Sequence, residues 1–375
     1  MNKFLTALSL FVSLILLNSC YSTNQKPVEK AAIIKGSNIS PALKKASAKV
    51  DSFFQNRSKR GLFNGSVLFG SEGKIIYENA FGYANFKKKE KLKISSSFQL
   101  ASLTKPITSY AILRLIQEGK LALTDTLGRF IKNFPYKGIT LHLLLAHRSG
   151  LPEYMYFADK YWKNKKIPIT NKDVIDLMKK YKPLRYYKPD HRYNYSNTNY
   201  VILAYIIEKV TGKTYKDFMK ESVFNPLQMT HTFVYQKEKG KRNTAEVIGY
   251  IRQRRKADDT YLNGVVGDKG IYSSVEDLFK WSKVIDNGKF VSDSLMKKAF
   301  TPQHKDLRIY DNYGYGWRIN ASDSTNKIVY HTGWWKGFRS YFIKELGEKN
   351  TIVVLSNISK AGILGSKELT SLISK

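Results

Sequence analysis

Ser102-Leu103-Thr104-Lys105 places a hydroxyl group and an amine three residues apart, immediately before an apolar helical pattern. Residues i and i+3 share one face of a helix, with their Cβ atoms about 5–6 Å apart. A serine nucleophile needs this spacing if a lysine is to accept its proton. In a chain with 63 lysine and arginine residues the pattern also arises by chance. The alternative is a helix N-cap with a nearby surface lysine. Other motifs in the chain are needed to distinguish this alternative from a catalytic pair.

The segments around Ser102 predict a sheet built from both ends of the chain. Extended segments at 65–71 and 74–83 are separated by a Glu72-Gly73 turn. The apolar pattern after Ser102 predicts a helix over 103–118 that stops at Gly119. Aromatic and β-branched residues predict four strands and a closing helix near the other end of the chain, at 313–319, 327–335, 338–346, 351–358 and 361–373.

The length and the order of these elements predict an α/β (α+β) fold with two lobes. The 375 residues exceed the size at which a single core stops growing, about 250–300 residues. We expect one domain over 43–375, with an antiparallel sheet from 60–85 and 313–358, flanked by helices. A mostly helical lobe is expected over about 120–300. A cleft between the lobes is the natural place for a site.

The first residues are typical of an export signal. Phe4 to Leu17 is an uncharged apolar run, shorter than the roughly 20 residues that span a bilayer. It leads to Leu17-Asn18-Ser19-Cys20, which resembles a bacterial lipobox and contains the chain's single cysteine. We therefore expect a signal peptide at 1–19, a lipidated Cys20 that anchors the protein to the membrane, and a tether over 20–42. The alternative is an ordinary secretory signal with an incidental cysteine; both predict export to the periplasm or the cell exterior.

The net charge of +33 is extreme, and basic residues recur in clusters. Export argues against a nucleic-acid partner. An anionic surface of the cell envelope is the better candidate, because each basic residue near such a membrane contributes about 1 kcal/mol. The alternative is a set of solvated basic faces with no particular partner. The single cysteine excludes an internal disulfide and a cysteine-cluster metal site.

Two further motifs follow Ser102 in the chain. Tyr195-Ser196-Asn197 precedes a predicted helix over 200–211, and His331-Thr332-Gly333 lies on a predicted strand before Trp334. Taken singly, Tyr195 would be a packing residue among 25 tyrosines, and His331 a structural histidine. In this order and spacing, the three motifs resemble the penicillin-recognising serine hydrolases. They are most similar to the branch of class C β-lactamases, DD-carboxypeptidases and esterase-like relatives, and supporting stretches occur at 143–151, 224–227 and 267–281.

The resemblance covers about residues 45–375 and implies the β-lactamase/DD-peptidase fold. It also implies that Ser102 is the nucleophile, at a helix N-terminus that favours a developing oxyanion. Lys105 must become neutral to accept a proton, and burial would lower its pKa in that direction. Tyr195 would share the proton with Lys105 as a coupled pair, and Asn197 would hold the lysine and the substrate amide.

The third motif is implied to bind substrate through His331, Thr332, Gly333 and Trp334. The oxyanion hole of the family would use the backbone N–H groups of Ser102 and Trp334. The resemblance implies no cofactor and no metal. His142 and His147 are five residues apart and do not share a helix face, so they are not expected to bind a metal; His147 is expected to hold a loop. The absence of a G-x-S-x-G motif argues against an α/β-hydrolase.

His331 and Trp334 narrow the expected activity. Class C β-lactamases have lysine where this chain has His331, and a neutral histidine binds a carboxylate less well. Trp334 is bulky where a smaller residue would leave room for that carboxylate. Arg318 could supply the cation, or it could be a solvated strand arginine. The motifs look closest to a DD-carboxypeptidase or esterase of the cell envelope that forms an acyl-Ser102 intermediate with a peptide, ester or β-lactam. A class C-type β-lactamase and a non-catalytic envelope binding protein remain the alternatives.

Overall fold

The computed structural model describes residues 39–240, 246–288, 290–303, 312–322, 326–359 and 365–373. Outside these residues lie the predicted signal peptide, Cys20 and most of the predicted tether. Export and lipid anchoring therefore stay predictions from the sequence. Within the described ranges, no helix has the length and apolar character that a membrane span requires.

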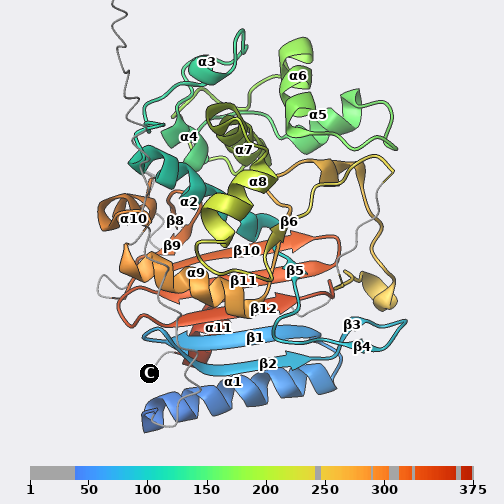
Figure 1. Cartoon of the computed structure of the whole chain (residues 1–375), viewed down its shortest axis with the longest axis vertical. Coiled ribbons are helices and arrows are strands. Elements are labelled where there is room, and N and C mark those ends of the chain that lie inside the picture. Colours follow the sequence, from blue (N-terminus) through green and yellow to red (C-terminus); the bar gives the residue numbers. More distant parts are fainter. Residues whose placement is uncertain are drawn as a thin grey trace, which may run out of the picture.

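A seven-stranded antiparallel sheet forms the centre of the molecule, in the order β2-β1-β12-β11-β10-β9-β8 (Figure 1). Strand β1 pairs with β12, so that Val67 faces Val354 and the two ends of the chain meet in the middle of the sheet. This arrangement confirms the predicted fold class of an antiparallel sheet flanked by helices. The strands span β1 Gly65–Ser71, β2 Lys74–Phe81, β8 Asn312–Tyr313, β9 Arg318–Asn320, β10 Ile328–Trp335, β11 Phe338–Glu345 and β12 Thr351–Ser356.

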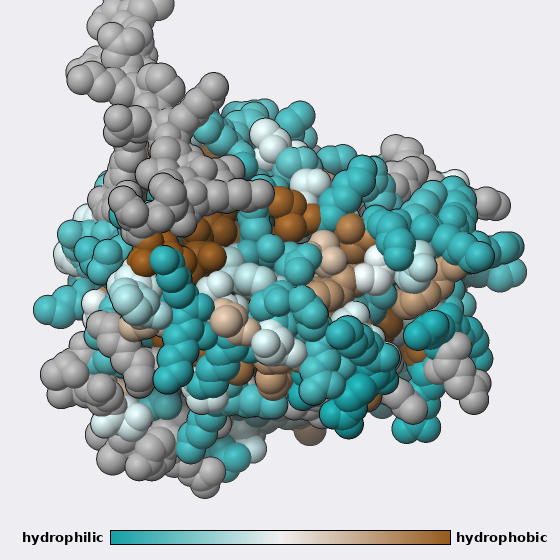
Figure 2. Space-filling model, turned by 90° about the horizontal axis from the view of Figure 1, so that it is seen from below, coloured by the Kyte–Doolittle hydropathy of each residue, from teal (hydrophilic) through white to brown (hydrophobic). Residues whose placement is uncertain are grey.

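Alternation along the strands builds a separate core on each face of the sheet. Val67 and Val354 pack with α1 (Pro41–Lys59) and α11 (Ser366–Ile373) on one face. Leu68 on β1 and the neighbouring apolar residues of β12 belong to the larger core on the opposite face, which includes α2 (Thr104–Gln117) and α9 (Val275–Asn287). Viewed from the α1 side, most of the surface is hydrophilic, and apolar side chains show in several separate areas (Figure 2).

Most of the remaining helices form a lobe beyond the end of the sheet at which β10, β9 and β8 lie (Figure 1). A helix that brings Asn197 to the site, α7, ends at Gly212 in the left-handed conformation, as a C-terminal glycine commonly does. The helices are α3 Leu127–Phe130, α4 Leu141–Leu145, α5 Tyr154–Tyr161, α6 Asn171–Tyr181, α7 Asn197–Thr211, α8 Tyr215–Met219 and α10 Asp293–Ala299.

Short strands and irregular turns complete the fold. Two small sheets, β3-β4 and β5-β7-β6, lie outside the central sheet, and the sequence patterns did not predict the second of them within the helical lobe. These segments are β3 Tyr83–Asn85, β4 Glu90–Lys91, β5 Phe98–Gln99, β6 Phe233–Val234 and β7 Ile271–Ser273, with single helical turns at η1 Ala101–Leu103, η2 Lys220–Phe224, η3 Arg252–Arg254 and η4 Tyr261–Gly264.

The predicted single strand over 313–319 is wrong in one respect. The chain turns between β8 and β9, where Gly316 has a φ of +82° and Gly314 N–H donates a hydrogen bond to the carbonyl of Trp317. Glycine adopts this left-handed conformation without steric strain, so the chain folds back into two short strands. The turn packs against α2, where a Cβ at Gly316 would lie 2.9 Å from that of Ser109. The second half of the hairpin carries Arg318 toward the site.

Candidate active site

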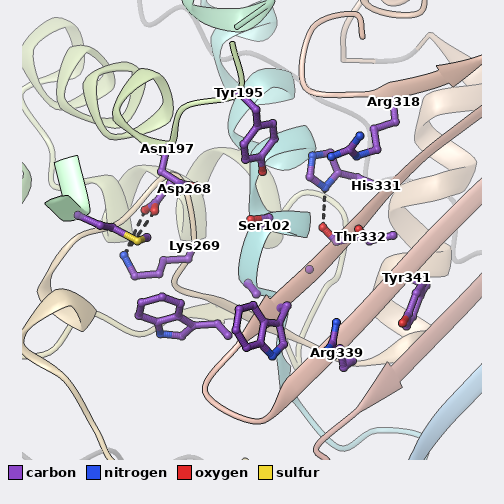
Figure 3. A pocket seen from close by; sticks show the side chains of 15 residues that line it. Ser102, Tyr195, Asn197, Asp268, Lys269, Arg318, His331, Thr332, Arg339 and Tyr341 are labelled. Carbon is purple, nitrogen blue, oxygen red and sulfur yellow. Dashed lines mark hydrogen bonds and ion pairs between the residues drawn. The ribbon is translucent and has the colours of Figure 1, made fainter. Parts of the chain in front are cut away.

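The three sequence motifs meet around one cavity of about 420 Å³. Figure 3 shows Ser102 in its centre, with Tyr195 above it, Asn197 on one side and His331 on the other. Thr332, Gly333 and Trp334 also line the cavity, and Lys105 is fully buried next to Ser102. The structure therefore brings together every residue that the sequence proposed for catalysis and substrate binding, although they come from a helix, a loop and a strand.

Ser102 lies in the single helical turn η1 that leads into α2. Ala101, just before it, has a φ of +51°, a left-handed conformation that an alanine adopts only at some cost in backbone energy. The strand β10 packs directly onto this segment, because a Cβ at Gly333 would lie 2.1 Å from the carbonyl oxygen of Leu100. Only glycine allows that approach. The close packing holds the start of the nucleophile turn against the strand that carries the third motif.

The amine of Lys105 donates a hydrogen bond of 2.9 Å to Ser102 Oγ and one of 3.0 Å to the backbone carbonyl of Asp268. Burial lowers the pKa of Lys105 to about 8, against opposing effects from the nearby Asp268 and Glu153 carboxylates. A minor fraction of the amine is therefore neutral near neutral pH, and the neutral form predominates above about pH 8. The geometry and the pKa both suit a base that accepts the serine proton.

Tyr195 points its hydroxyl group toward Ser102 (Figure 3). Burial raises the pKa of this phenol above its ordinary value, and the interaction with Ser102 only partly opposes the shift. The Lys105 amine also lies 5.0 Å from the centre of the Tyr195 ring. Tyr195 is therefore protonated at neutral pH and able to donate.

His147 supports the loop that carries Tyr195. The imidazole ring packs on the Tyr195 ring with centroids 4.3 Å apart, and Nδ1 accepts hydrogen bonds from Ser196 N–H at 3.2 Å and from the Asn199 amide at 2.9 Å. Nδ1 can accept both bonds only when it is unprotonated. Through these contacts His147 holds the loop that carries Tyr195, as expected from the sequence.

Asn197 differs from the expectation that it would hold the lysine. Its side-chain amide donates to Glu153 Oε2 at 3.2 Å, and its backbone N–H donates to the same oxygen at 2.8 Å. Within the described residues, Lys105 bonds Ser102 and the Asp268 carbonyl instead. The physical reason is that Glu153, which the sequence motifs did not single out, caps the start of α5 and accepts both Asn197 donors. Burial raises the pKa of the Glu153 carboxyl.

Asp268 and Lys269 form a second buried group that the sequence reasoning missed. The Lys269 amine donates to the hydroxyl of Tyr154, which in turn donates to Asp268 Oδ2 at 3.2 Å. Lys269 also lies 3.4 Å from the Asp268 carboxylate. Burial lowers the pKa of Lys269. The only available signal was their position in the supporting stretch 267–281, because charged residues in a loop usually indicate solvent exposure.

His331 is neutral and fully enclosed. Nδ1–H donates to the Thr332 carbonyl at 2.8 Å, and the hydroxyl of Tyr313 donates to Nε2 at 3.1 Å. Burial and the neighbouring Arg318 lower the pKa of His331 well below its ordinary value. Arg318 lines the cavity, with its guanidinium 5.8 Å from the Tyr195 ring centre, and so does not have the solvated position of the alternative interpretation. Among the described residues that line the cavity, Arg318 is the cation that lies beside His331.

The described residues contain no group of three or more histidine, cysteine, aspartate or glutamate side chains that could hold a metal ion. The site presents serine, lysine and tyrosine side chains together with backbone N–H groups. This set is suited to acyl transfer through a covalent serine intermediate.

The fold and the site together define a penicillin-recognising serine hydrolase. The family model described as Beta-lactamase matches residues 50–364, and the chain belongs to this family. Penicillin-binding protein 4* of Bacillus subtilis is 35% identical over 321 residues, which cover 82% of this chain and 71% of the relative. Protein flp of Staphylococcus aureus (strain MRSA252) is 29% identical over 83% of this chain, which spans 63% of that protein.

Solved structures agree with this assignment. The octameric penicillin-binding protein homologue from Pyrococcus abyssi has a TM-score of 0.73 and 28% identity, covering 84% of this chain and 74% of that one. The penicillin-binding protein from Bacillus halodurans has a TM-score of 0.73 at 23% identity and shares the fold, covering 85% of this chain and 98% of that one. The protein is therefore a serine hydrolase with the β-lactamase and penicillin-binding protein fold.

Proposed function

We propose that this protein is a DD-carboxypeptidase or a related peptidase or esterase of the cell envelope, acting through an acyl-Ser102 intermediate. The observation that carries the proposal is the 2.9 Å hydrogen bond between the buried Lys105 amine and Ser102 Oγ, beside a protonated Tyr195. A neutral lysine and a protonated phenol on either side of a serine provide the base and the acid that acyl transfer needs.

In the proposed reaction, neutral Lys105 takes the proton from Ser102 as Oγ bonds to the substrate carbonyl carbon. The carbonyl π electrons move onto oxygen, and the backbone N–H groups of Ser102 and Trp334 stabilise that oxyanion. When the oxyanion collapses, the bond to the leaving group breaks, Tyr195 protonates the leaving nitrogen or oxygen, and Tyr195 recovers a proton from Lys105. Water then attacks the acyl-Ser102 ester with the proton transfers reversed, which releases the acid and restores Ser102.

The neutral His331 and the similarity to a penicillin-binding relative support the choice of substrate class. A D-alanyl-D-alanine peptide and a penicillin both present an acyl group that Ser102 could attack. We expect slow release after penicillin acylation, which separates a peptidase from a β-lactamase. Rapid nitrocefin turnover would instead support the class C-type β-lactamase.

The test combines mass spectrometry with a substrate panel. Wild type and Ser102→Ala are exposed to benzylpenicillin, and the adduct is mapped by peptide analysis. The same proteins are assayed with a muropeptide, a p-nitrophenyl ester, nitrocefin and a D-alanine amide. The proposal expects an adduct at Ser102 and hydrolysis of the peptide or ester by wild type alone. Absence of both would favour the non-catalytic binding protein.

The cellular location is a second part of the proposal, supported by the sequence. The apolar run over 4–17 and the lipobox-like residues before Cys20 favour export followed by lipid anchoring. The net charge of +33 favours contact with an anionic envelope surface. Metabolic labelling with a fatty-acid probe tests the anchor: wild type should be labelled and found in the membrane fraction, whereas Cys20→Ala should lose the label. An unlabelled wild type would support an ordinary secretory signal.

A further inference from the structure

The outward face of α1 carries a row of lysines that no carboxylate of the described residues neutralises. Lys44, Lys45 and Lys59 are exposed, on the side of the helix opposite the buried Val50 and Phe54. Among the residues that the structure describes, none of these three amines takes part in a salt bridge. The face therefore presents a positive charge that is available to an external partner.

The single carboxylate of α1 is turned away from this row. Asp51 Oδ1 accepts a hydrogen bond of 2.7 Å from the hydroxyl of Tyr77 on β2, and Oδ2 accepts one of 2.7 Å from the Gln55 amide. On the other flank of the helix, Arg57 lies 3.6 Å from Glu368 of α11. These contacts fix the helix on the body of the protein, so the row of lysines keeps its orientation relative to the sheet.

The row is extended along the helix axis. Lys45 and Lys59 are fourteen residues apart, which is a rise of about 20 Å in an α-helix. Between them the outward face carries Ala48 and Ser52, which are small and add no large apolar side chain for insertion. Figure 2 looks onto this side of the molecule and shows a mostly hydrophilic surface. Charges spread over this length are suited to an array of phosphate headgroups rather than to one small ligand.

The position of α1 in the chain places it next to the predicted lipid anchor. The chain from Cys20 to the start of α1 at Pro41 spans at most about 75 Å. In Figure 1, α1 lies at one end of the longest axis of the molecule, and α5 and α6 lie toward the other end. Because the predicted tether joins the body at α1, this end can approach the bilayer without the tether passing along the body.

The catalytic cavity lies away from this end. In the central sheet, β1, β12 and β11 separate β2, which contacts α1 through Tyr77, from β10, which carries the third motif. Neighbouring strands are about 4.8 Å apart, so these four steps amount to about 19 Å. A bilayer in contact with α1 therefore leaves the cavity around Ser102 open.

We propose that the outward face of α1 docks the protein onto the anionic lipid bilayer that holds its Cys20 anchor. The inference rests on the proposed export and lipid anchoring and deepens them, because it names the surface that meets the membrane and the orientation of the catalytic cavity. It does not depend on the acyl-Ser102 chemistry.

The binding test uses the exported protein with Cys20→Ala, which carries no lipid, as the parent. It should cosediment with phosphatidylglycerol vesicles and not with phosphatidylcholine vesicles. Each lysine near an anionic bilayer strengthens binding about five-fold. The triple variant Lys44→Gln/Lys45→Gln/Lys59→Gln should therefore bind phosphatidylglycerol vesicles about 10- to 100-fold more weakly. The same three positions changed to arginine keep the charge and should bind as the parent does.

The matched control removes three charges from the other end of the molecule. Lys160, Lys163 and Lys166 are exposed, at the end of α5 and in the loop that follows it. Their triple glutamine variant should bind as the parent does, and thermal melts establish that both triple variants are folded. An equal loss in both variants would show that net charge alone decides, and a loss in the control alone would place the contact on the helical lobe. Either result overturns the proposal, as does a parent that binds dextran sulfate, a soluble anionic polymer, but not the vesicles.

A label on the helix reads the orientation directly. With Cys20→Ala the chain has no cysteine, so Ser52→Cys or Lys163→Cys supplies a single thiol for an environment-sensitive fluorophore. Phosphatidylglycerol vesicles should shift the emission of the label at position 52 and leave that at position 163 unchanged. The reverse pattern, or no shift at either position, overturns docking through α1.

These measurements separate the inference from the proposed function. They need neither turnover nor a lipid, so docking is supported even if Ser102 proves inert or the fatty-acid probe does not label Cys20. A parent that binds no vesicle overturns docking even if Cys20 is labelled and Ser102 is acylated.

Discussion

The Lys269 amine lies 3.4 Å from the carboxylate of Asp268, in a pair whose side chains are only 3% and 1% exposed. The same residue, Asp268, accepts the hydrogen bond of Lys105 through its backbone carbonyl. A buried ion pair thus borders the proposed base of the reaction. The negative charge of Asp268 raises the pKa of Lys105, because it favours the protonated form of the lysine.

Lys269→Met should destabilise the fold and reduce the fraction of Lys105 that is neutral at pH 7. The substitution leaves the Asp268 carboxylate buried without its cation, a change that typically costs about 3–5 kcal/mol of unfolding free energy. The unpaired carboxylate should also raise the pKa of Lys105 and so lower the rate at neutral pH. Urea denaturation and a pH–rate profile measure the two effects. The double variant Lys269→Met/Asp268→Asn should recover part of both; failure to recover either would exclude charge pairing as the cause.

Ester hydrolysis should rise with pH with an apparent pKa of about 8. Burial lowers the pKa of Lys105 to about 8, and only the neutral amine accepts the proton of Ser102. The active fraction is therefore small well below that pH and complete above it. The profile of kcat/KM for a neutral p-nitrophenyl ester measures this limb. The apparent pKa measured in this way belongs to the coupled Lys105–Tyr195 pair. A rate that is independent of pH between about 6 and about 9 would contradict the role of Lys105 as the base.

His147→Phe should lower kcat about 10- to 100-fold with little change in KM. The phenyl ring preserves packing against Tyr195 but removes the acceptor for Ser196 N–H and the Asn199 amide. The loop that carries Tyr195 then loses its alignment, and small displacements of a catalytic group reduce rates strongly. His191→Phe changes an exposed histidine and is the control. A wild-type kcat in His147→Phe would show that packing alone holds the loop.

Gly333→Ala should impair both folding and catalysis. Its methyl group would lie 2.1 Å from the carbonyl oxygen of Leu100 and 2.3 Å from the hydroxyl of Ser340, so β10 must move away from the nucleophile turn. Overpacking of this kind typically costs about 1–3 kcal/mol. Loss of an aligned oxyanion donor typically lowers kcat about 10²–10³-fold. Thermal melts and acylation rates measure the two effects.

Gly128→Ala is the control for this substitution, because a Cβ atom at Gly128 would lie 4.0 Å from the side-chain oxygen of Thr126, which is an ordinary van der Waals distance. It should leave the acylation rate at the wild-type value. If Gly333→Ala acylates as fast as Gly128→Ala, the contact between β10 and the nucleophile turn has no part in catalysis.

Much of the fold was predictable from local patterns. The helix predicted over 103–118 is α2, which spans Thr104–Gln117. The strand predicted over 65–71 is β1 and has the predicted bounds. These elements depend on periodicity and on stop signals within a few residues. The strand predicted over 313–319 failed because a glycine in the left-handed conformation ends one strand and starts another. From the sequence alone, a glycine within a run of aromatic residues does not indicate whether its backbone is extended or left-handed.

By itself, the sequence determined the family and the residues to consider, above all Ser102 and Lys105. Their hydrogen bond is a local property, because three residues of a helical turn bring the two side chains to one face. Only the tertiary structure decided which charges surround them. Asn197 bonds Glu153, Lys269 pairs with Asp268 in the interior, and Arg339 enters the cavity opposite Trp334. Strand register and burial set these contacts, and both depend on residues far apart in the chain.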